Sequence, residues 1–239
     1  MQIYHTSHCG STLLATLLSE VIPSYSEPSW CHKIIAGENI DFNEEIQKYK
    51  NSIIKVPSGL CHYAHQIEDK KIFLYRNLKN HLFKLLTLDE DRHDYLNYYY
   101  EYFQKNIHPK LKKVNFDNDG KKHVFLWCNR IFWLLDSSNV IAVNSNTFFE
   151  NKKETLHEIC EFLDIKKIKN FLYQDYNVKM IGLIHNEIEI SKVSPNLENS
   201  CITYPSYGII EDEICLHDEG VMQLVNWAKE NIQIPEFLI

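Results

Sequence analysis

The amino-acid sequence predicts a single α/β domain, over residues 1–239, with a central and mostly parallel sheet flanked by helices. Short apolar runs of strand length alternate along the chain with segments in which apolar residues repeat at helical spacing, the pattern typical of such a sheet. Hydrophobic residues make up 44% of the 239 residues and charged residues 24%, which is enough apolar surface for one sizeable core. We find no internal repeat in the chain.

The same two patterns place the elements. We expect strands at residues 2–6, 52–56, 71–75 and 139–143, the last as a core strand. We expect helices at residues 13–21, 78–86, 123–135, 152–163 and 216–231. Residues 90–104 carry tyrosines at helical spacing, which indicates either a packed helix face or a wall that binds a substrate. Residues 22–39 contain two prolines and a glycine and are predicted to form a loop.

The stretch His8-Cys9-Gly10-Ser11-Thr12 lies between the first predicted strand and the first predicted helix. A tight turn at this point directs unpaired backbone N–H groups and the positive end of the helix dipole at one spot. Gly10 lets the backbone come close to whatever binds there. The stretch therefore predicts an anion site for phosphate or sulfate, although an ordinary helix start would show much of the same pattern.

Two residues of this region disfavour an ordinary ATP or GTP site. A Walker A loop requires Gly-x-x-x-x-Gly-Lys-Ser/Thr. His5 occupies the place of the first glycine and Ser11 the place of the lysine. The predicted fold is thus P-loop-like, but the anion differs from the phosphates of a bound nucleoside triphosphate.

The loop resembles the 5′-phosphosulfate loop of sulfotransferases that use 3′-phosphoadenosine 5′-phosphosulfate (PAPS), in the form met in soluble bacterial members. The resemblance rests on Thr6-Ser7-His8-Cys9-Gly10-Ser11-Thr12-Leu13-Leu14 and on Ser26-Glu27-Pro28. It implies that PAPS is bound by His8, Cys9, Gly10, Ser11, Thr12 and Leu13. His8 stands where most members have a lysine or arginine, so its charge, and with it the stabilisation of the transferring group, is expected to depend on pH.

A second segment strengthens the resemblance. An apolar run ends at Arg76 and gives way to a helical pattern, which places Arg76 at the carboxyl end of a strand, where open α/β sheets bind ligands. The segment is similar to the 3′-phosphate segment of sulfotransferases, in which an Arg-Asn-Pro-like turn is followed eight residues later by a serine. Leu78 replaces the proline and Lys84 stands in the place of the serine. The resemblance implies that Arg76 and Lys84 hold the 3′-phosphate.

The resemblance also suggests catalytic groups. Lys55 matches the lysine of a Lys-Thr-His-Leu-Pro-like segment, and it would stabilise the bridging oxygen together with His8. The histidine of that segment has no counterpart unless His62 or His65 moves in. Glu27 is the candidate base, provided that burial raises its pKa; the alternative is a solvated loop carboxylate.

The composition of the chain argues against some classes of binding partner. A net charge of -7 and a pI near 5.9 argue against nucleic acid, and no apolar run approaches the roughly 20 residues of a membrane span. Seven cysteines without a paired pattern indicate reduced thiols in a cytoplasmic protein. We expect PAPS as the donor, adenosine 3′,5′-bisphosphate as its product, a small-molecule acceptor and no metal.

Three functions follow from these observations. The leading one is transfer of a sulfuryl group from PAPS to a hydroxyl or amine of a small molecule. The second is a catalytically impaired sulfotransferase-like binding protein, motivated by His8, by Lys84 and by the missing histidine. The third is a kinase with an irregular P-loop, which would need magnesium and ATP.

Overall fold

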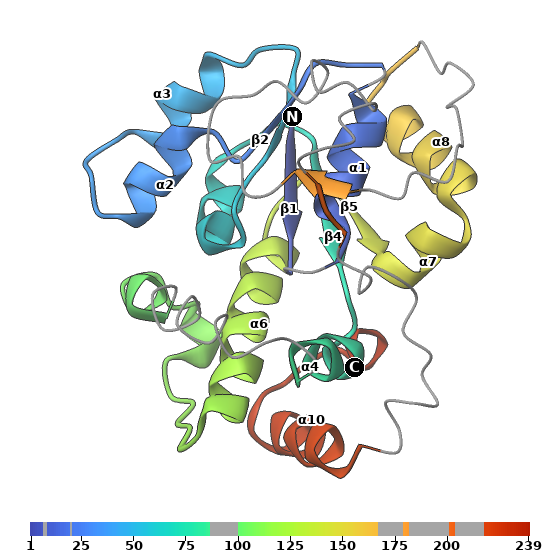
Figure 1. Cartoon of the computed structure of the whole chain (residues 1–239). Coiled ribbons are helices and arrows are strands. Elements are labelled where there is room, and N and C mark those ends of the chain that lie inside the picture. Colours follow the sequence, from blue (N-terminus) through green and yellow to red (C-terminus); the bar gives the residue numbers. More distant parts are fainter. Residues whose placement is uncertain (7–8, 20, 87–99, 167–178, 182–200, 204–217) are drawn as a thin grey trace.

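A five-stranded sheet, parallel throughout, forms the centre of the computed structural model, which describes residues 1–6, 9–19, 21–86, 100–166, 179–181, 201–203 and 218–239 (Figure 1). The strand order is β2 (Ser24–Ser26), β3 (Ile53–Lys55), β1 (Gln2–His5), β4 (Lys71–Tyr75), β5 (Val140–Asn144). The predicted α/β class with a mostly parallel central sheet is confirmed. A separate antiparallel pair joins β6 (Lys179–Ile181) to β7 (Cys201–Thr203).

Alternating side chains bury both faces of the sheet. Tyr4 and Phe73 belong to one hydrophobic cluster, whereas Ile3 and Ile72 belong to the other. The first cluster is completed by α2 (Ser29–Ile35), α3 (Phe42–Gln47), the 3₁₀ segment η1 (Ser58–Gln66), α4 (Leu78–Leu86), α6 (Asp119–Leu135) and α10 (Glu219–Asn231). The second is completed by α1 (Ser11–Leu18), α7 (Ser145–Glu150) and α8 (Lys152–Phe162), seen to the right of β1 in Figure 1. The result is three layers, helix, sheet and helix.

Most predicted elements are present with shifted ends. The first helix begins at Ser11 and ends at Leu18 rather than spanning residues 13–21. The buried helix predicted at 123–135 begins at Asp119, because the side chain of Asn118 accepts a hydrogen bond from the backbone N–H of Lys121 at 2.9 Å and caps the helix. The final helix starts at Glu219 rather than at residue 216.

Two predictions were wrong. Residues 22–39 are not a loop: they contain β2 and α2, with Pro28 at the position immediately before the helix. β2 escaped prediction because it is short, polar and paired only with β3. Residues 139–143 do form a strand, but it is the edge strand β5 rather than a core strand, and only Val143 of its side chains is buried.

Several predictions fall outside the described residues. Ser7 and His8 do so, as do residues 87–99, which carry most of the predicted tyrosine stripe. Residues 100–104 are helical, in agreement with the end of that predicted helix. Within the described ranges, no helix is both long and apolar enough to cross a membrane.

Candidate functional site

The order of the strands places a topological switch point between β1 and β4, and we call the carboxyl edge at this point the β1–β4 crevice. After β1 the chain passes through α1 to β2 on one side of the sheet, whereas after β4 it passes to β5 on the other side. Neighbouring parallel strands whose connections leave in opposite directions open a crevice at their carboxyl ends, and ligands of open α/β sheets bind there. In Figure 1 this edge is the lower end of β1 and β4.

Three hydrogen bonds fasten the segment after β1 to the end of β4. The backbone N–H of Thr6 donates to the carbonyl of Leu74 at 3.3 Å, and the thiol of Cys9 donates to the same carbonyl at 3.3 Å. The backbone N–H of Arg76 donates to the hydroxyl of Thr6 at 3.1 Å. Because Thr6 and Cys9 are fully buried, these bonds fix the approach of the chain to α1.

The start of α1 presents backbone donors to the crevice. Gly10 is the N-cap with φ 88° and ψ 17°, a left-handed conformation that glycine adopts without strain. The first intrahelical bond runs from the N–H of Leu14 to the carbonyl of Gly10 at 3.0 Å, so the N–H groups of residues 11–13 precede the helical ladder. No acidic residue lies in the first turn. The predicted role of residues 9–13 as an anion cradle suits this geometry and stays a prediction.

Two buried cations lie at the same edge. Lys55 ends β3 with 6% exposure, and Arg76 follows β4 with 1% exposure. Burial raises the pKa of the Cys9 thiol, and the positive charges of Arg76 and Lys55 oppose that rise. Both cations therefore act on the residue that precedes Gly10, as an anion site at this point requires.

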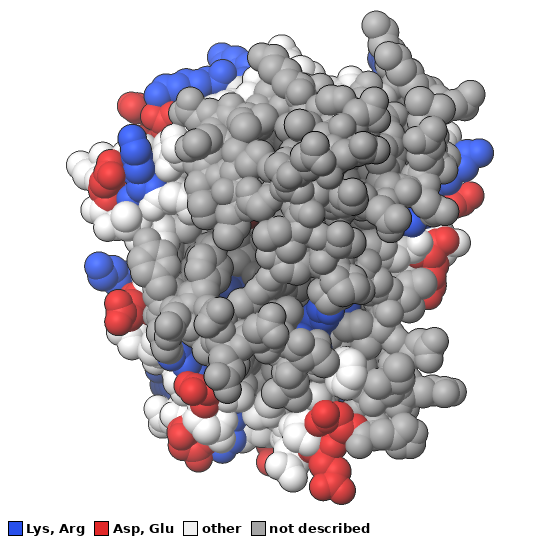
Figure 2. Space-filling model, viewed as in Figure 1, with Lys and Arg blue, Asp and Glu red and all other residues white. Residues whose placement is uncertain are grey.

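Charges of both signs surround the described part of the face seen in Figure 2. Figure 2 shows Lys and Arg side chains intermixed with Asp and Glu around the described rim of this face. The net charge of the chain is -7. The described rim of this face is therefore not a basic surface.

Glu27 is the acidic member of the site. It lies directly after β2, with its backbone N–H donating to the carbonyl of Lys55 at 2.8 Å and with φ of 50°. One carboxylate oxygen, Oε1, forms an ion pair with Nζ of Lys55 and lies 3.8 Å from Nε2 of His5. The other oxygen, Oε2, lies 3.7 Å from Nε2 of His32 on α2. We call Glu27, Lys55, His5 and His32 the carboxylate cluster.

The electrostatics of this cluster bear on the predicted role of Glu27 as a base. Burial raises the pKa of Glu27, but the charge of Lys55, the nearby His5 imidazole and the hydrogen bond from Lys55 outweigh it, so the pKa lies well below its usual 4.5. The condition set for Glu27 as a base, a raised pKa, is therefore not met while Lys55 is paired with it. Burial lowers the pKa of His5 to about 4, and the imidazole is neutral at pH 7.

Sequence reasoning missed His5 and His32. In the sequence, His5 was considered only as the residue in place of a Walker A glycine. Its position at the end of a strand could have placed it at the carboxyl edge of the sheet. The two histidines that were considered lie in other surroundings. His62 is buried with its ring 4.2 Å from that of Tyr63, whereas the exposed His65 stacks on Trp133 at 4.8 Å.

The predicted partner of Arg76 lies on the helix that follows it. Lys84 is in the last turn of α4 and is 7% exposed. A shared hold of these two residues on a 3′-phosphate stays a prediction, as does the role of His8. Within the part of the chain that the structure describes, no group of histidine, cysteine and acidic side chains is arranged to hold a metal ion.

Trp127 supports the Arg76 turn from α6. Its indole N–H, which is fully buried, donates to the carbonyl of Arg76 at 3.1 Å. Replacing Trp127 with Phe leaves this buried carbonyl without its donor, and we expect the free energy of unfolding to fall by about 1–3 kcal/mol. Urea denaturation of the Trp127→Phe variant measures the change, and a loss below about 0.5 kcal/mol would show that the bond contributes little.

Comparison with known proteins gives a single kind of match. No family model matches the chain, and no curated protein matches it. Among solved structures, it is similar to the "Sulfotransferase Domain from the Curacin Biosynthetic Pathway". The two share 12% sequence identity, the match covers 98% of each chain, and the TM-score is 0.45. A likeness at this level does not establish a shared activity.

Proposed function

We propose that this protein is a PAPS-dependent sulfotransferase that acts on a hydroxyl or amine of a small-molecule acceptor. The observation that carries the proposal is that four features share the carboxyl edge of the sheet: the glycine-started helix α1 after β1, the buried cations Lys55 and Arg76, and the carboxylate of Glu27 after β2. This set combines fixed donors for an anion with a candidate proton acceptor. The loop resemblance described above selects the phosphosulfate among possible anions.

The residues divide into two binding groups and one reacting group. The backbone of residues 9–13 with the hydroxyls of Ser11 and Thr12 would hold the 5′-phosphosulfate, and Arg76 with Lys84 would hold the 3′-phosphate. When bound, PAPS supplies the sulfuryl group. Lys55, with His8, would stabilise charge on the bridging oxygen, and Glu27 would take the proton of the acceptor.

The residues at the strand ends favour this reaction over magnesium-dependent phosphoryl transfer. A P-loop kinase places a lysine in its loop and a carboxylate at a strand end to hold magnesium. Ser11 stands in place of that lysine, and among the described strand ends Glu27 is the one carboxylate. Glu27 is engaged by Lys55, which makes it a poor magnesium ligand.

One observation favours the second candidate, a binding protein without turnover. The base and the catalytic cation are paired with each other, so neither is available in the structure as it stands. The two functions differ in turnover. We expect release of adenosine 3′,5′-bisphosphate from PAPS that depends on an added phenol, alcohol or amine and that Glu27→Gln slows. Binding of PAPS with no release across the acceptor panel would support the binding protein instead.

Replacement of Arg76 is expected to weaken nucleotide binding. Loss of a charge-assisted contact of about 2–3 kcal/mol raises the dissociation constant of adenosine 3′,5′-bisphosphate by roughly 30- to 150-fold in Arg76→Ala. Titration calorimetry measures the constant. Arg76→Lys keeps the charge and should recover part of the affinity, while Lys110→Ala, at an exposed lysine on the 3₁₀ turn Pro109–Leu111, should bind as the unmodified chain does. Equal affinity in folded Arg76→Ala would remove Arg76 from the site.

A further inference from the structure

The carboxylate cluster presents a conflict between two proposed roles. Lys55 is assigned to an anion and Glu27 to a proton, yet the two side chains are paired with each other. Each group weakens the other for its task, because the carboxylate neutralises the cation and the cation keeps the carboxylate a weak base. A bound anion that attracts Lys55 would therefore change both the position of the ammonium and the basicity of the Glu27 carboxylate.

The geometry restricts which part can move. The backbones of Glu27 and Lys55 are joined by a hydrogen bond of 2.8 Å that extends the β2–β3 pairing, so the two chain segments stay together. The ammonium of Lys55 is a point charge on a flexible stem, and its charge also acts on Cys9 at the entrance to α1. Because the backbones are held together, the ammonium can leave the carboxylate only by a change of side-chain torsions.

We propose that an anion bound at the start of α1 draws Lys55 away from Glu27, and that the released carboxylate then takes up a proton from solvent, so that donor binding is coupled to proton uptake in the carboxylate cluster. This inference rests on the proposed function. Its consequence is an order of events. The pKa of Glu27 rises only after the donor has bound, and the carboxylate that stays unprotonated is then a stronger base for the acceptor, which reacts second. The molecules in which Glu27 has taken up a proton must release it before the carboxylate can serve as the base.

The groups that face Glu27 determine whether its pKa rises or falls when Lys55 moves away. Lys55 reaches it from β3, His5 from β1 and His32 from α2. The charge of Glu27 also acts on the Cys31 thiol. Burial is the largest cause of the raised pKa of Cys31, and the charge of Glu27 is the next largest. Without the ammonium, burial is the main influence on Glu27, and burial favours the protonated acid. The negative charge of the ligand acts in the same direction.

Calorimetry in paired buffers measures the coupling. Adenosine 3′,5′-bisphosphate is titrated into the full chain at pH 6.5 in PIPES and in bis-Tris, whose ionisation enthalpies differ, and the difference in heat gives the number of protons taken up. Because the phosphates of the probe also titrate, Glu27→Gln supplies the reference. We expect the unmodified chain to take up more protons than Glu27→Gln, by a fraction of one proton per bound ligand.

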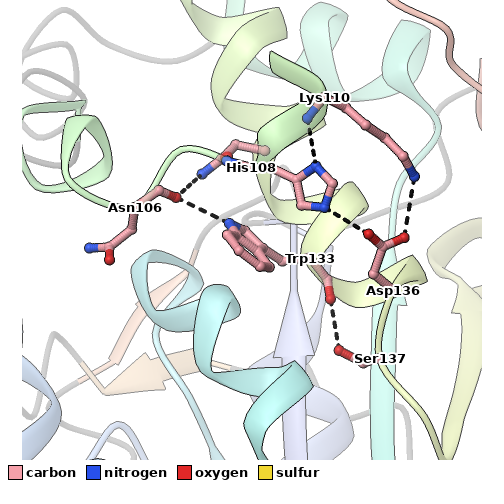
Figure 3. A network of polar contacts seen from close by, with 7 residues as sticks. Asn106, His108, Lys110, Trp133, Asp136 and Ser137 are labelled. Carbon is pink, nitrogen blue, oxygen red and sulfur yellow. Dashed lines mark hydrogen bonds and ion pairs between the residues drawn. The ribbon is translucent and has the colours of Figure 1, made fainter. Parts of the chain in front are cut away.

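The chain offers a matched control. Asp136 accepts a hydrogen bond from Lys110 at 3.2 Å and lies 2.9 Å from Nε2 of His108, so it repeats the combination of carboxylate, lysine and histidine (Figure 3). It follows α6 and precedes β5, at the opposite edge of the sheet from the crevice. Asp136→Asn should leave the proton uptake on binding unchanged.

The outcomes separate the two proposals. Equal uptake by the unmodified chain and by Glu27→Gln, with binding intact in both, would overturn the coupling and leave the sulfotransferase proposal standing. Lys55→Met tests the coupling independently, because Glu27 already lacks its partner in that variant and the extra uptake should disappear. An unmodified chain that binds no adenosine 3′,5′-bisphosphate would contradict the proposed function, and the coupling with it.

Discussion

Replacing Lys55 with Met is expected to lower the free energy of unfolding by about 3 kcal/mol at pH 7. The change removes the cation from a pair in which Lys55 is buried and the side chain of Glu27 is only 20% exposed. Breaking a buried pair from one side costs about 3–5 kcal/mol because a charge stays behind without its partner. We take the lower end of that range since Glu27 keeps some contact with water and lies near His5 and His32.

The sign of the pH dependence should invert in this variant. In the unmodified chain the pKa of Glu27 is lowered, so its contribution to stability is present above pH 4.5 and is lost as the pH falls through the folded-state pKa. In Lys55→Met burial raises the folded-state pKa above 4.5, and stability is lost as the pH rises through it. The difference between the two proteins should therefore widen from pH 4 to pH 7 in urea denaturation.

A double variant completes this test. Glu27→Gln with Lys55→Met leaves no charge on either side chain, so we expect it to be more stable at pH 7 than Lys55→Met alone. If the double variant is as unstable as the single one, the loss comes from packing of the lysine stem and not from the charge on Glu27.

Gly10→Ala is expected to destabilise the protein by about 2–4 kcal/mol and to abolish nucleotide binding. Two effects add. Gly10 has φ 88°, where an alanine is strained, and an added Cβ would lie 2.7 Å from Cζ of Phe149 on α7. Thermal or urea denaturation measures the stability, and titration with adenosine 3′,5′-bisphosphate measures binding.

A second substitution separates the two effects of Gly10→Ala. Phe149→Leu shortens the side chain that the Cβ would meet, so adding it to Gly10→Ala should relieve the steric part of the loss, relative to Phe149→Leu alone. The backbone part, about 1–2 kcal/mol, should persist. A full recovery would contradict the importance of the left-handed conformation at this position.

The predictable parts of the fold are those whose signal is local. β1, β3 and β4 are buried along their whole length and read as apolar runs, so their positions and parallel pairing follow from the sequence. β2 and α2 could not be predicted from composition, because β2 is polar and depends on pairing with β3, and Pro28 reads as a loop residue although it immediately precedes α2. β5 has the composition of a core strand, but its place at the sheet edge depends on the strand order.

In the candidate site, too, some residues could be identified from the local sequence, whereas the contacts between them could not. Arg76 could be identified because it ends a predicted apolar run, where a parallel sheet places its ligands, whereas Lys55 was identified through the family resemblance. The pairing of Glu27 with Lys55 and its approach to His5 and His32 join residues from four elements. Such contacts depend on strand order and on the direction of α2, neither of which the sequence specifies locally. The lowered pKa of Glu27 follows from that assembly, so the sequence could name a raised pKa only as a condition for its role as a base.

We propose that the β1–β4 crevice binds the nucleotide of PAPS. A thermal-shift titration of the unmodified chain with adenosine 3′,5′-bisphosphate, run beside ATP with magnesium, would show this binding. A ligand at about 100 times its dissociation constant stabilises a protein by roughly 2.7 kcal/mol, and the midpoint of unfolding should rise by roughly 2–10 °C with the bisphosphate. A rise with ATP and magnesium alone would contradict the account and favour a kinase, and no rise with either ligand would contradict a nucleotide site at this edge of the sheet.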